Sequence, residues 1–146
     1  MPTRPLPSPP AAPFALLRID HVVLRVRDTE RAIGFYCGVL GCTIEKRRDD
    51  LGLVHLRAGA SLIDLVSHDG RLGRQGGALA GPEGRNVDHL CLRIEPFDEA
   101  AIRALMARNG VPVDGEVQNN FGAEGDGPSI YVTDPDGNGV ELKGPA

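Results

Sequence analysis

The amino-acid sequence predicts an α+β fold made of two copies of one β-α-β-β-β module. The main observation is an internal repeat. The segment I-D-H-V-V-L-R-V-R, which starts at Ile19, returns as V-D-H-L-C-L-R-I-E, which starts at Val87. Four of the nine positions are identical, among them an Asp-His step, and three others exchange one aliphatic residue for another. A repeat with so long a period indicates a duplicated supersecondary unit.

An amphipathic helix is expected after each copy of the repeated segment. In the first copy Asp28 is a suitable N-cap, the apolar residues fall on one helical face, and Gly41 stands where a left-handed C-terminal cap is expected. In the second copy Pro96 suits a first helical position and Gly110 ends the apolar stripe.

Three short β-prone runs follow each helix, divided by turn residues such as Gly59 and D-P-D-G-N. The predicted modules cover residues 19–69 and 87–144 and form one domain, with a Gly-rich linker between them. Residues 1–18 are rich in proline and are expected to form a flexible tail. The predicted strands that follow the helices are 42–47, 53–58 and 61–66 in the first module and 113–118, 129–133 and 139–143 in the second.

The composition is that of an ordinary soluble globular protein, with 41% hydrophobic and 25% charged residues. The net charge of -4 argues against a nucleic-acid-binding protein, and no apolar stretch approaches the roughly 18 residues of a membrane span. The chain opens without the apolar core of a secretory signal, and its three cysteines include no C-x-x-C pair. We therefore expect a cytoplasmic protein with reduced thiols that acts on a small molecule, with no nucleic-acid or membrane partner.

Two histidines and two carboxylates are the candidate metal ligands. His21 and His89 hold the same position in the repeated strand, and Asp64 occupies in the first module the position of Glu141 in the second. Because side chains alternate along a strand, pseudo-twofold pairing of the modules would bring the four together. Imidazole and carboxylate suit a divalent metal such as Zn, Ni, Mn, Co or Fe(II), and two His with one carboxylate leave positions open for substrate oxygen.

Basic side chains share the faces of these predicted ligands. Long basic side chains in a buried cup either extend to its rim or contact an anionic substrate. We therefore expect a substrate that carries a carboxylate or a similar anion. The candidate substrate-binding residues are Arg25, Arg93, Lys143, Tyr131 and His55, with Ser129 as a further candidate.

Other residues near the predicted ligands have structural interpretations. The Gly-rich segment 119–127 either closes over the cavity or forms a plain hairpin. Asp20 and Asp88 precede the predicted ligands and are expected to point to the opposite face, where they anchor the starts of the strands. Cys91 is expected to be a small reduced core residue.

The order and spacing of four motifs resemble the superfamily of glyoxalase I, bleomycin-resistance proteins and extradiol dioxygenases, the vicinal oxygen chelate (VOC) superfamily. The motifs are I-D-H-V-V-L, F-Y-x-x-V-L-G, V-D-H-L-C-L and D-P-D-G-N-G-V-E-L, and they span the chain from Arg18 to Gly144. The resemblance implies that the modules form an open, barrel-like cup of sheet, with the helices outside and a metal at its floor. It also implies a homodimer.

The resemblance further implies which residues bind the metal and perform the chemistry. His21 and Glu141 match the first His and the last Glu of the superfamily, and His89 matches the His of the second module. Glyoxalase I-like members use a further Glu where this chain has Asp64, which is one methylene shorter. Either Glu141 or Asp64 would act as the base as well as a ligand.

Three functions follow as alternatives. The leading one is a glyoxalase I-like lyase or isomerase that acts through a metal-bound enediolate. The first alternative is an Fe(II) extradiol-type ring-cleaving dioxygenase, in which His55 and Tyr131 would stand in for the His and Tyr that handle protons. The second alternative is a metal-free binding protein that sequesters a ligand, as bleomycin-resistance proteins do.

Overall fold

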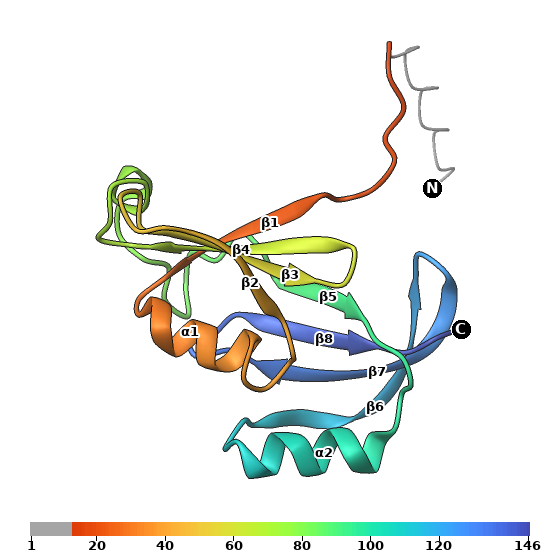
Figure 1. Cartoon of the computed structure of the whole chain (residues 1–146). Helices are drawn as coiled ribbons and strands as arrows, with labels where there is room; N and C mark the ends of the chain where they lie inside the picture. The colour runs from red at the N-terminus through yellow and green to blue at the C-terminus, as the bar shows by residue number, and fades with distance from the viewer. Residues whose placement is uncertain (1–12) are drawn as a thin grey trace, which may run out of the picture.

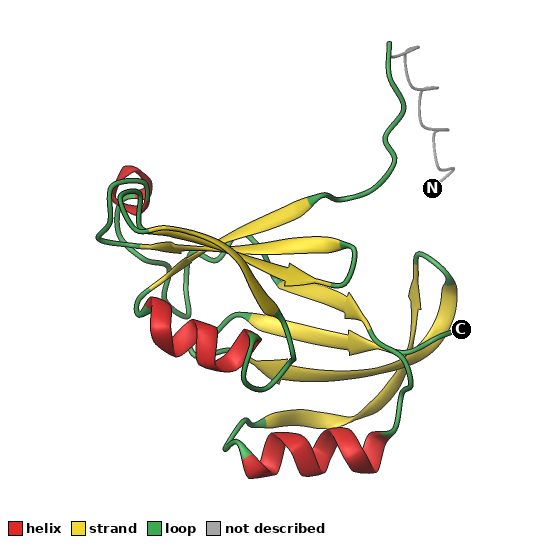
Figure 2. Cartoon of the chain, viewed as in Figure 1, coloured by secondary structure: helices red, strands yellow, loops and turns green. Residues whose placement is uncertain are grey.

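The computed structural model describes residues 13–146, and its elements follow the predicted order twice (Figure 1, Figure 2). The first module contains β1 (His21–Val26), α1 (Thr29–Tyr36), β2 (Thr43–Arg48), β3 (Leu53–Ala58) and β4 (Ser61–Ser67). A short 3-10 helix, η1 (Gly73–Gly76), lies in the linker. The second module contains β5 (His89–Arg93), α2 (Glu99–Arg108), β6 (Val113–Gly122), β7 (Gly125–Thr133) and β8 (Gly139–Lys143).

The predicted flexible tail, residues 1–18, is described only in part. Residues 1–12 lie outside the described residues. From residue 13 to the start of β1 the chain forms neither helix nor strand, and its side chains are exposed, including Leu16 (91%) and Leu17 (90%).

Each module forms one four-stranded sheet, and the two sheets have the same topology. The strand orders are β1-β4-β3-β2 and β5-β8-β7-β6, so β1 and β5 are edge strands. In both sheets the first strand pairs in parallel with the last, and the remaining pairs are antiparallel. The sheets stay separate and do not close into a barrel. The predicted α+β fold of two βαβββ modules with open sheets is confirmed.

The sequence predicted the start of α1 and the end of α2 correctly, but not the other two helix ends. Helix α1 ends at Tyr36 with Cys37 as its C-cap, so the expected cap at Gly41 is wrong, whereas Gly110 with φ +64 directly follows the C-cap Asn109 of α2. The Asp28 side chain accepts a hydrogen bond from the Arg31 backbone N–H at 3.1 Å and caps α1. The prediction that α2 starts at Pro96 is wrong, because Asp98 is the N-cap and accepts from the backbone N–H of Ala101 at 3.0 Å. An Asp side chain can satisfy an unpaired N–H of the first turn, whereas proline only fits a helical φ there.

The segment predicted as a lid or a hairpin is a hairpin. β6 continues to Gly122 and β7 begins at Gly125, so residues 119–127 extend the ladder of the second sheet. Their backbone groups are paired across the two strands, which fixes this segment as a wall beside β8.

One hydrophobic core joins the two modules. In β1, Leu24 and Val26 are buried in this core, whereas His21 and Val23 on the opposite face are exposed. In Figure 1, α1 lies between the two sheets and α2 lies beneath β6. The buried residues of the core come from both sheets and both helices: Leu24, Val26, Ala32, Phe35, Tyr36, Cys42, Val54, Leu56, Ile63, Leu65, Ile102, Met106, Ile130, Val132, Val140 and Leu142.

A buried hydrogen bond links the modules through this core. The Tyr36 hydroxyl on α1 donates to Oδ2 of Asp134, which follows β7, at 2.6 Å. Asp134 also accepts from two backbone N–H groups, of Asp136 and Asn138. Burial, strengthened by the neighbouring Asp134 charge, raises the pKa of Tyr36 far above its usual value, so the phenol stays a donor.

No helix among the described residues has the length and apolar character needed to cross a membrane.

Replacing Tyr36 with Phe should destabilise the protein. The substitution keeps the buried ring but leaves the Asp134 carboxylate without its phenol donor, which should lower the free energy of unfolding by about 1.5–3 kcal/mol. Urea unfolding measures this change. Tyr131→Phe is the matched control, because the Tyr131 hydroxyl is only half-buried, and we expect a change within about 0.5 kcal/mol. Equal losses in the two variants would contradict a special role for the link between the modules.

Candidate functional site

His89 and Glu141 form the centre of the candidate site. β5 and β8 are neighbouring parallel strands, with Cys91 opposite Glu141 in the register, so His89 lies on the same face. The His89 Nε2 atom is 3.1 Å from Oε2 of Glu141. The carboxylate is buried and the imidazole is exposed. Such a pair can share a proton or hold a cation at the surface of the sheet.

A carboxylate holds each candidate His ring from behind. Nδ1 of His89 is 2.7 Å from Oδ2 of Asp88, and Nδ1 of His21 is 2.7 Å from Oδ1 of Asp20. The expectation that both Asp side chains point away from the His residues is therefore wrong. A short exposed Asp at the start of a strand is free to turn back to the next ring. With Nδ1 as the donor, Nε2 is the nitrogen available to a metal.

These contacts also change the affinity of the rings for protons. The hydrogen bond to Asp88 raises the pKa of His89, and the nearby Glu141 charge adds to this effect. The hydrogen bond to Asp20 likewise raises the pKa of His21. A metal at either ring therefore competes with a proton that the aspartate has made harder to remove.

The surroundings of Glu141 favour its ionised form. Burial alone would raise the pKa of Glu141, but the side chains of Ser129, Asn120 and Cys91 and the positive charge of His89 outweigh it, and the pKa is lowered. Nδ2 of Asn120 donates to Oε1 of Glu141 at 3.2 Å. Glu141 is therefore a carboxylate near neutral pH, ready to act as a ligand or to accept a proton.

Tyr131 stands next to this pair. It lies opposite Glu141 in the register of β7 and β8, and its ring meets the His89 ring edge to face with 5.5 Å between centroids. Asn120 donates from Nδ2 to the Tyr131 hydroxyl oxygen at 3.0 Å. Burial and the Glu141 charge raise the pKa of Tyr131, so its hydroxyl remains a proton donor near neutral pH.

A cavity of about 360 Å³ opens beside His89 and Glu141. One of its walls is the β6–β7 hairpin at residues 121–124, and Cys91 and Lys143 also line it. Burial and the Glu141 charge raise the pKa of Cys91 to about 11, so the thiol is protonated and poorly nucleophilic near neutral pH. Cys91 is exposed on this surface and is not the core residue that we expected from the sequence.

The first module carries the remaining predicted ligands. Asp64 on β4 lies opposite His55 on β3, and Nδ1 of His55 is 2.8 Å from Oδ1 of Asp64. By register, this pair corresponds to Tyr131 and Glu141 of the second module. The longer Glu141 side chain reaches the His of its own first strand, whereas the shorter Asp64 is engaged by His55. Sequence reasoning left the face of His55 open because the hairpin register was unknown.

The described residues of one chain do not bring the predicted ligands together. Within residues 13–146, no group of three or more His, Cys, Asp or Glu side chains is arranged to hold a metal ion. His89 and Glu141 are adjacent, but His21 and Asp64 belong to the other sheet. Each sheet turns its His-bearing face away from the shared core. The prediction of convergence inside one chain is therefore not met, since strand alternation gives the face of a residue but not the placement of one sheet relative to the other.

The donor set nevertheless fits a divalent metal in part. His89 offers Nε2, Glu141 offers an ionised carboxylate, and both belong to paired strands that fix their backbones. Two such donors are the nitrogen and oxygen ligands of a two-His-one-carboxylate site that lacks its second His.

The two arginines among the predicted substrate-binding residues already have partners. The Arg25 guanidinium donates to backbone carbonyls within linker residues 73–78, including Gly73 at 3.1 Å. Nε of Arg93 is 2.5 Å from Glu124, and its Nη2 is 2.9 Å from Glu95. Arg25 therefore anchors the linker, and the charge of Arg93 is balanced by its neighbours.

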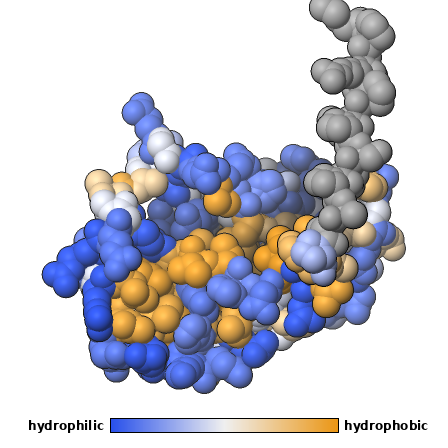
Figure 3. Space-filling model, turned by 90° about the horizontal axis from the view of Figure 1, so that it is seen from above, coloured by the Kyte–Doolittle hydropathy of each residue, from blue (hydrophilic) through white to orange (hydrophobic). Residues whose placement is uncertain are grey.

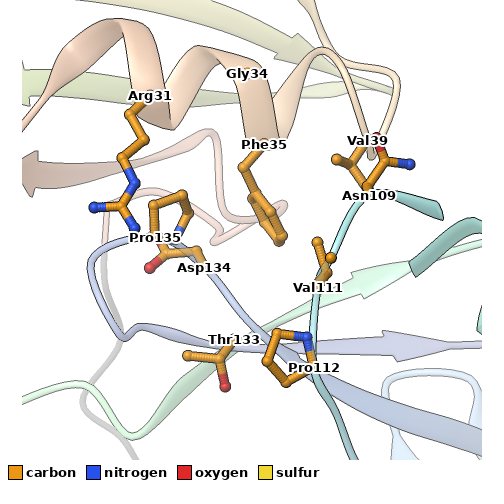
Figure 4. Close-up of a pocket in the computed structure, with 11 residues that line it drawn as sticks. Arg31, Gly34, Phe35, Val39, Asn109, Val111, Pro112, Thr133, Asp134 and Pro135 are labelled. Atoms are coloured by element: carbon orange, nitrogen blue, oxygen red, sulfur yellow. The ribbon is translucent and has the colours of Figure 1, made fainter. Parts of the chain in front are cut away.

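Another cavity, of about 430 Å³, lies at the seam between the modules (Figure 4). Arg31 and Phe35 of α1 face Val111, Pro112 and Asp134 across it. None of the predicted metal ligands lines this cavity. We assign it to the packing of the modules, because its buried carboxylate, Asp134, is already hydrogen-bonded to Tyr36.

The chain is similar to several known proteins over most of its length. It is 32% identical over 126 residues to Virulence protein STM3117 of Salmonella typhimurium, covering 86% of this chain and 82% of that protein. The crystal structure of STM3117 superposes with a TM-score of 0.71 and covers 91% of this chain and 100% of that one, at 27% identity.

Two further relatives have names that state an activity. Human mitochondrial methylmalonyl-CoA epimerase is 25% identical over 142 residues, which cover 94% of this chain and 78% of the epimerase. Catechol-2,3-dioxygenase of Bacillus subtilis is 27% identical over 128 residues, which cover 85% of this chain but 40% of that enzyme.

The family model of the Glyoxalase/Bleomycin resistance protein/Dioxygenase superfamily matches residues 18–142. This range holds both copies of the repeated strand and all four predicted metal ligands, from His21 to Glu141. The chain therefore belongs to the glyoxalase/bleomycin resistance protein/dioxygenase superfamily.

Proposed function

We propose that this protein is a metal-dependent enzyme that moves a proton next to a carbonyl group of a small oxygenated substrate, as a glyoxalase I-like lyase or isomerase does. The observation that carries this proposal is the contact of His89 Nε2 with Glu141, with Asp88 holding the ring from behind. A bound divalent metal would act as a Lewis acid that stabilises negative charge on two neighbouring substrate oxygens.

A second copy of the chain would complete the ligand set. His21 is exposed on the edge strand β1, and its Nδ1 contacts Asp20, which leaves Nε2 as the nitrogen for a metal. The same strand face carries Val23, which is 50% exposed, so it has an apolar surface to cover. We propose a homodimer in which His21 of one copy meets His89 and Glu141 of the other.

Apolar side chains near this face support such an association. The face seen from above in Figure 3 carries several apolar patches, one of them next to the start of the described chain. Three large apolar residues that precede β1 in the sequence are exposed, Leu16, Leu17 and Ile19, with Ile19 80% exposed. Contiguous exposed apolar surface typically marks a contact between proteins.

The side chains around Glu141 suit it for proton transfer. Its lowered pKa keeps it ionised, and Asn120 fixes one carboxylate oxygen while the other faces His89. The Tyr131 hydroxyl lies in the same network and can donate a proton or a hydrogen bond. Asp64 is the alternative base, and His55 would orient it through the 2.8 Å contact.

One observation favours a second candidate function, an Fe(II) extradiol-type dioxygenase. Ring cleavage of that type needs a proton donor close to the metal, and Tyr131 lies edge to face with the candidate ligand His89. The similarity to a catechol dioxygenase supports this candidate, and the similarity to an epimerase supports the leading one. A protein that binds no metal at all would instead be a ligand-sequestering member.

Metal analysis of protein purified without chelator should find about one divalent ion per chain. His89→Ala and Glu141→Ala should each lose this metal, because each removes a donor of the adjacent pair. His21→Ala should lose it as well. Ser61→Ala, on β4 outside the candidate ligand set, is the control and should keep the metal. Full metal occupancy in Glu141→Ala would contradict the proposed site.

Mixed dimers test whether two copies share each site. Chains carrying His21→Ala and chains carrying His89→Ala with Glu141→Ala should each bind no metal alone. Co-expressed with different affinity tags and purified through both, they should bind about one ion per dimer, because one intact His21 then meets one intact pair. A mixed dimer without metal, from variants that fold and associate, would argue against a shared site.

The identity of the reaction follows from paired assays. We expect turnover of 2-oxoaldehyde–thiol adducts without oxygen uptake, and a loss of about 10²–10⁴-fold in Glu141→Gln, since that change removes the base and keeps the shape. Asp64→Asn should reduce turnover less if Glu141 is the base. Oxygen uptake with catechols and bound iron would replace the leading candidate with the dioxygenase.

A further inference from the structure

Lys143 ends β8 on the same face as Glu141, two residues further along the strand. Its neighbours in the register are Arg93 on β5 and Ser129 on β7. Despite this position near the end of the chain, Lys143 is only 6% exposed. Its side chain lines the 360 Å³ cavity that also contains His89 and Glu141.

The Lys143 side chain is largely buried, and its ammonium group has no partner among the described residues. Within residues 13–146 it forms neither an ion pair nor a hydrogen bond, whereas the neighbouring Arg93 is paired with Glu124 and Glu95. An ammonium group that is largely enclosed and has no partner is available to an anion in the cavity.

The hairpin beside the cavity is shaped around this side chain. A Cβ atom at Gly122 would lie 2.7 Å from Cε of Lys143, and a Cβ atom at Gly127 would lie 2.7 Å from its Nζ. Any larger residue at either position would displace the lysine. The two glycines thus leave a channel in which the Lys143 side chain lies along the wall and its ammonium group reaches the backbone of Gly127.

A second polar group on the same face also lacks a partner. The Ser129 side chain is fully buried, and its hydroxyl makes no hydrogen bond of good geometry to any described residue. The hydroxyl favours the ionised form of the nearby Glu141, but it retains an unused hydrogen-bonding position. Ser129 does not itself line the cavity, so its contribution to the site is through Glu141, which does.

We propose that Lys143 receives an oxyanion group of the substrate, a carboxylate or a phosphate, in the cavity beside Glu141. Of the three basic residues that share the faces of the predicted ligands, Lys143 has an uncommitted charge, while Arg25 and Arg93 are already occupied. The assignment of this anion to a substrate rests on the proposed function. Binding of the anion itself requires no metal, because the ammonium group supplies the attraction.

Titration of the metal-free protein with sodium phosphate and with sodium acetate tests this proposal. The amide signals of Gly122 and Gly127 in a two-dimensional NMR spectrum should shift with at least one of the two salts. Sodium chloride at the same ionic strength and neutral acetamide should not shift them. Lys143→Met should weaken the binding by about tenfold or more, the loss expected for one charge-assisted hydrogen bond, and Lys143→Arg should retain most of it.

The two lysines of the chain provide an internal control. Lys46 is exposed on β2, so Lys46→Met should leave the anion affinity unchanged. In the unmodified protein, acetylation followed by peptide mass spectrometry should be slowed by the bound anion at Lys143 and not at Lys46. This measurement needs no variant and decides the matter if Lys143→Met fails to fold.

The outcomes separate this inference from the proposed function. A shift with phosphate alone or with acetate alone would identify the class of oxyanion. No shift with either salt, or equal affinity in Lys143→Met, would overturn the proposal whatever the metal content. Anion binding at Lys143 in a protein that binds no metal would overturn the proposed enzyme and leave the anion site in place.

Discussion

A sheet has two faces, and this chain uses one face of each sheet to build a single core. Leu24 and Val26 on β1 and their counterparts on the other strands bury their side chains with α1 and α2. Because side chains alternate along a strand, the residues between these apolar positions lie on the other face of the sheet. His21, His89 and Glu141 are found there. The position of the candidate site is therefore a consequence of how the apolar residues pack. The predicted ligands of the two modules lie apart for the same reason, because each sheet faces the core with its other side.

Much of the fold could be predicted from the repeat alone. Similar patterns in the two copies predict the same order of strands and helix along the chain twice. The carboxylates fall at equivalent register positions, Asp64 opposite Val23 and Glu141 opposite Cys91. Local chemistry also predicted the Asp28 cap correctly. The arrangement of the two sheets could not be predicted, because alternation along a strand carries no information about the contacts between modules. The turning of Asp20 and Asp88 towards the His rings depends on side-chain rotation, which the pattern does not encode.

The two copies have diverged in their ionisable residues while keeping one backbone plan. Position for position, His55 with Asp64 stands where Tyr131 with Glu141 stands in the second module. The two carboxylates contact different neighbours: Glu141, which is one methylene longer, contacts the His ring of the first strand of its module, and Asp64 contacts His55 on the adjacent strand. The second module additionally has the longer hairpin, which supplies Asn120 and the cavity wall. The two modules are therefore related by pseudosymmetry in their backbones but not in their ionisable side chains.

Arg25, which the sequence suggested as a substrate-binding residue, instead orders part of the linker. Its guanidinium group donates hydrogen bonds to several carbonyls of a glycine-rich segment, whose glycines would otherwise adopt many conformations. Gly76 packs directly against it, because a Cβ atom there would lie 2.6 Å from Cζ of Arg25. The side chain thereby holds the first part of the linker against β1 of the first module. In the proposed homodimer each copy would therefore bring this part of the linker already ordered, so that association would not have to order it.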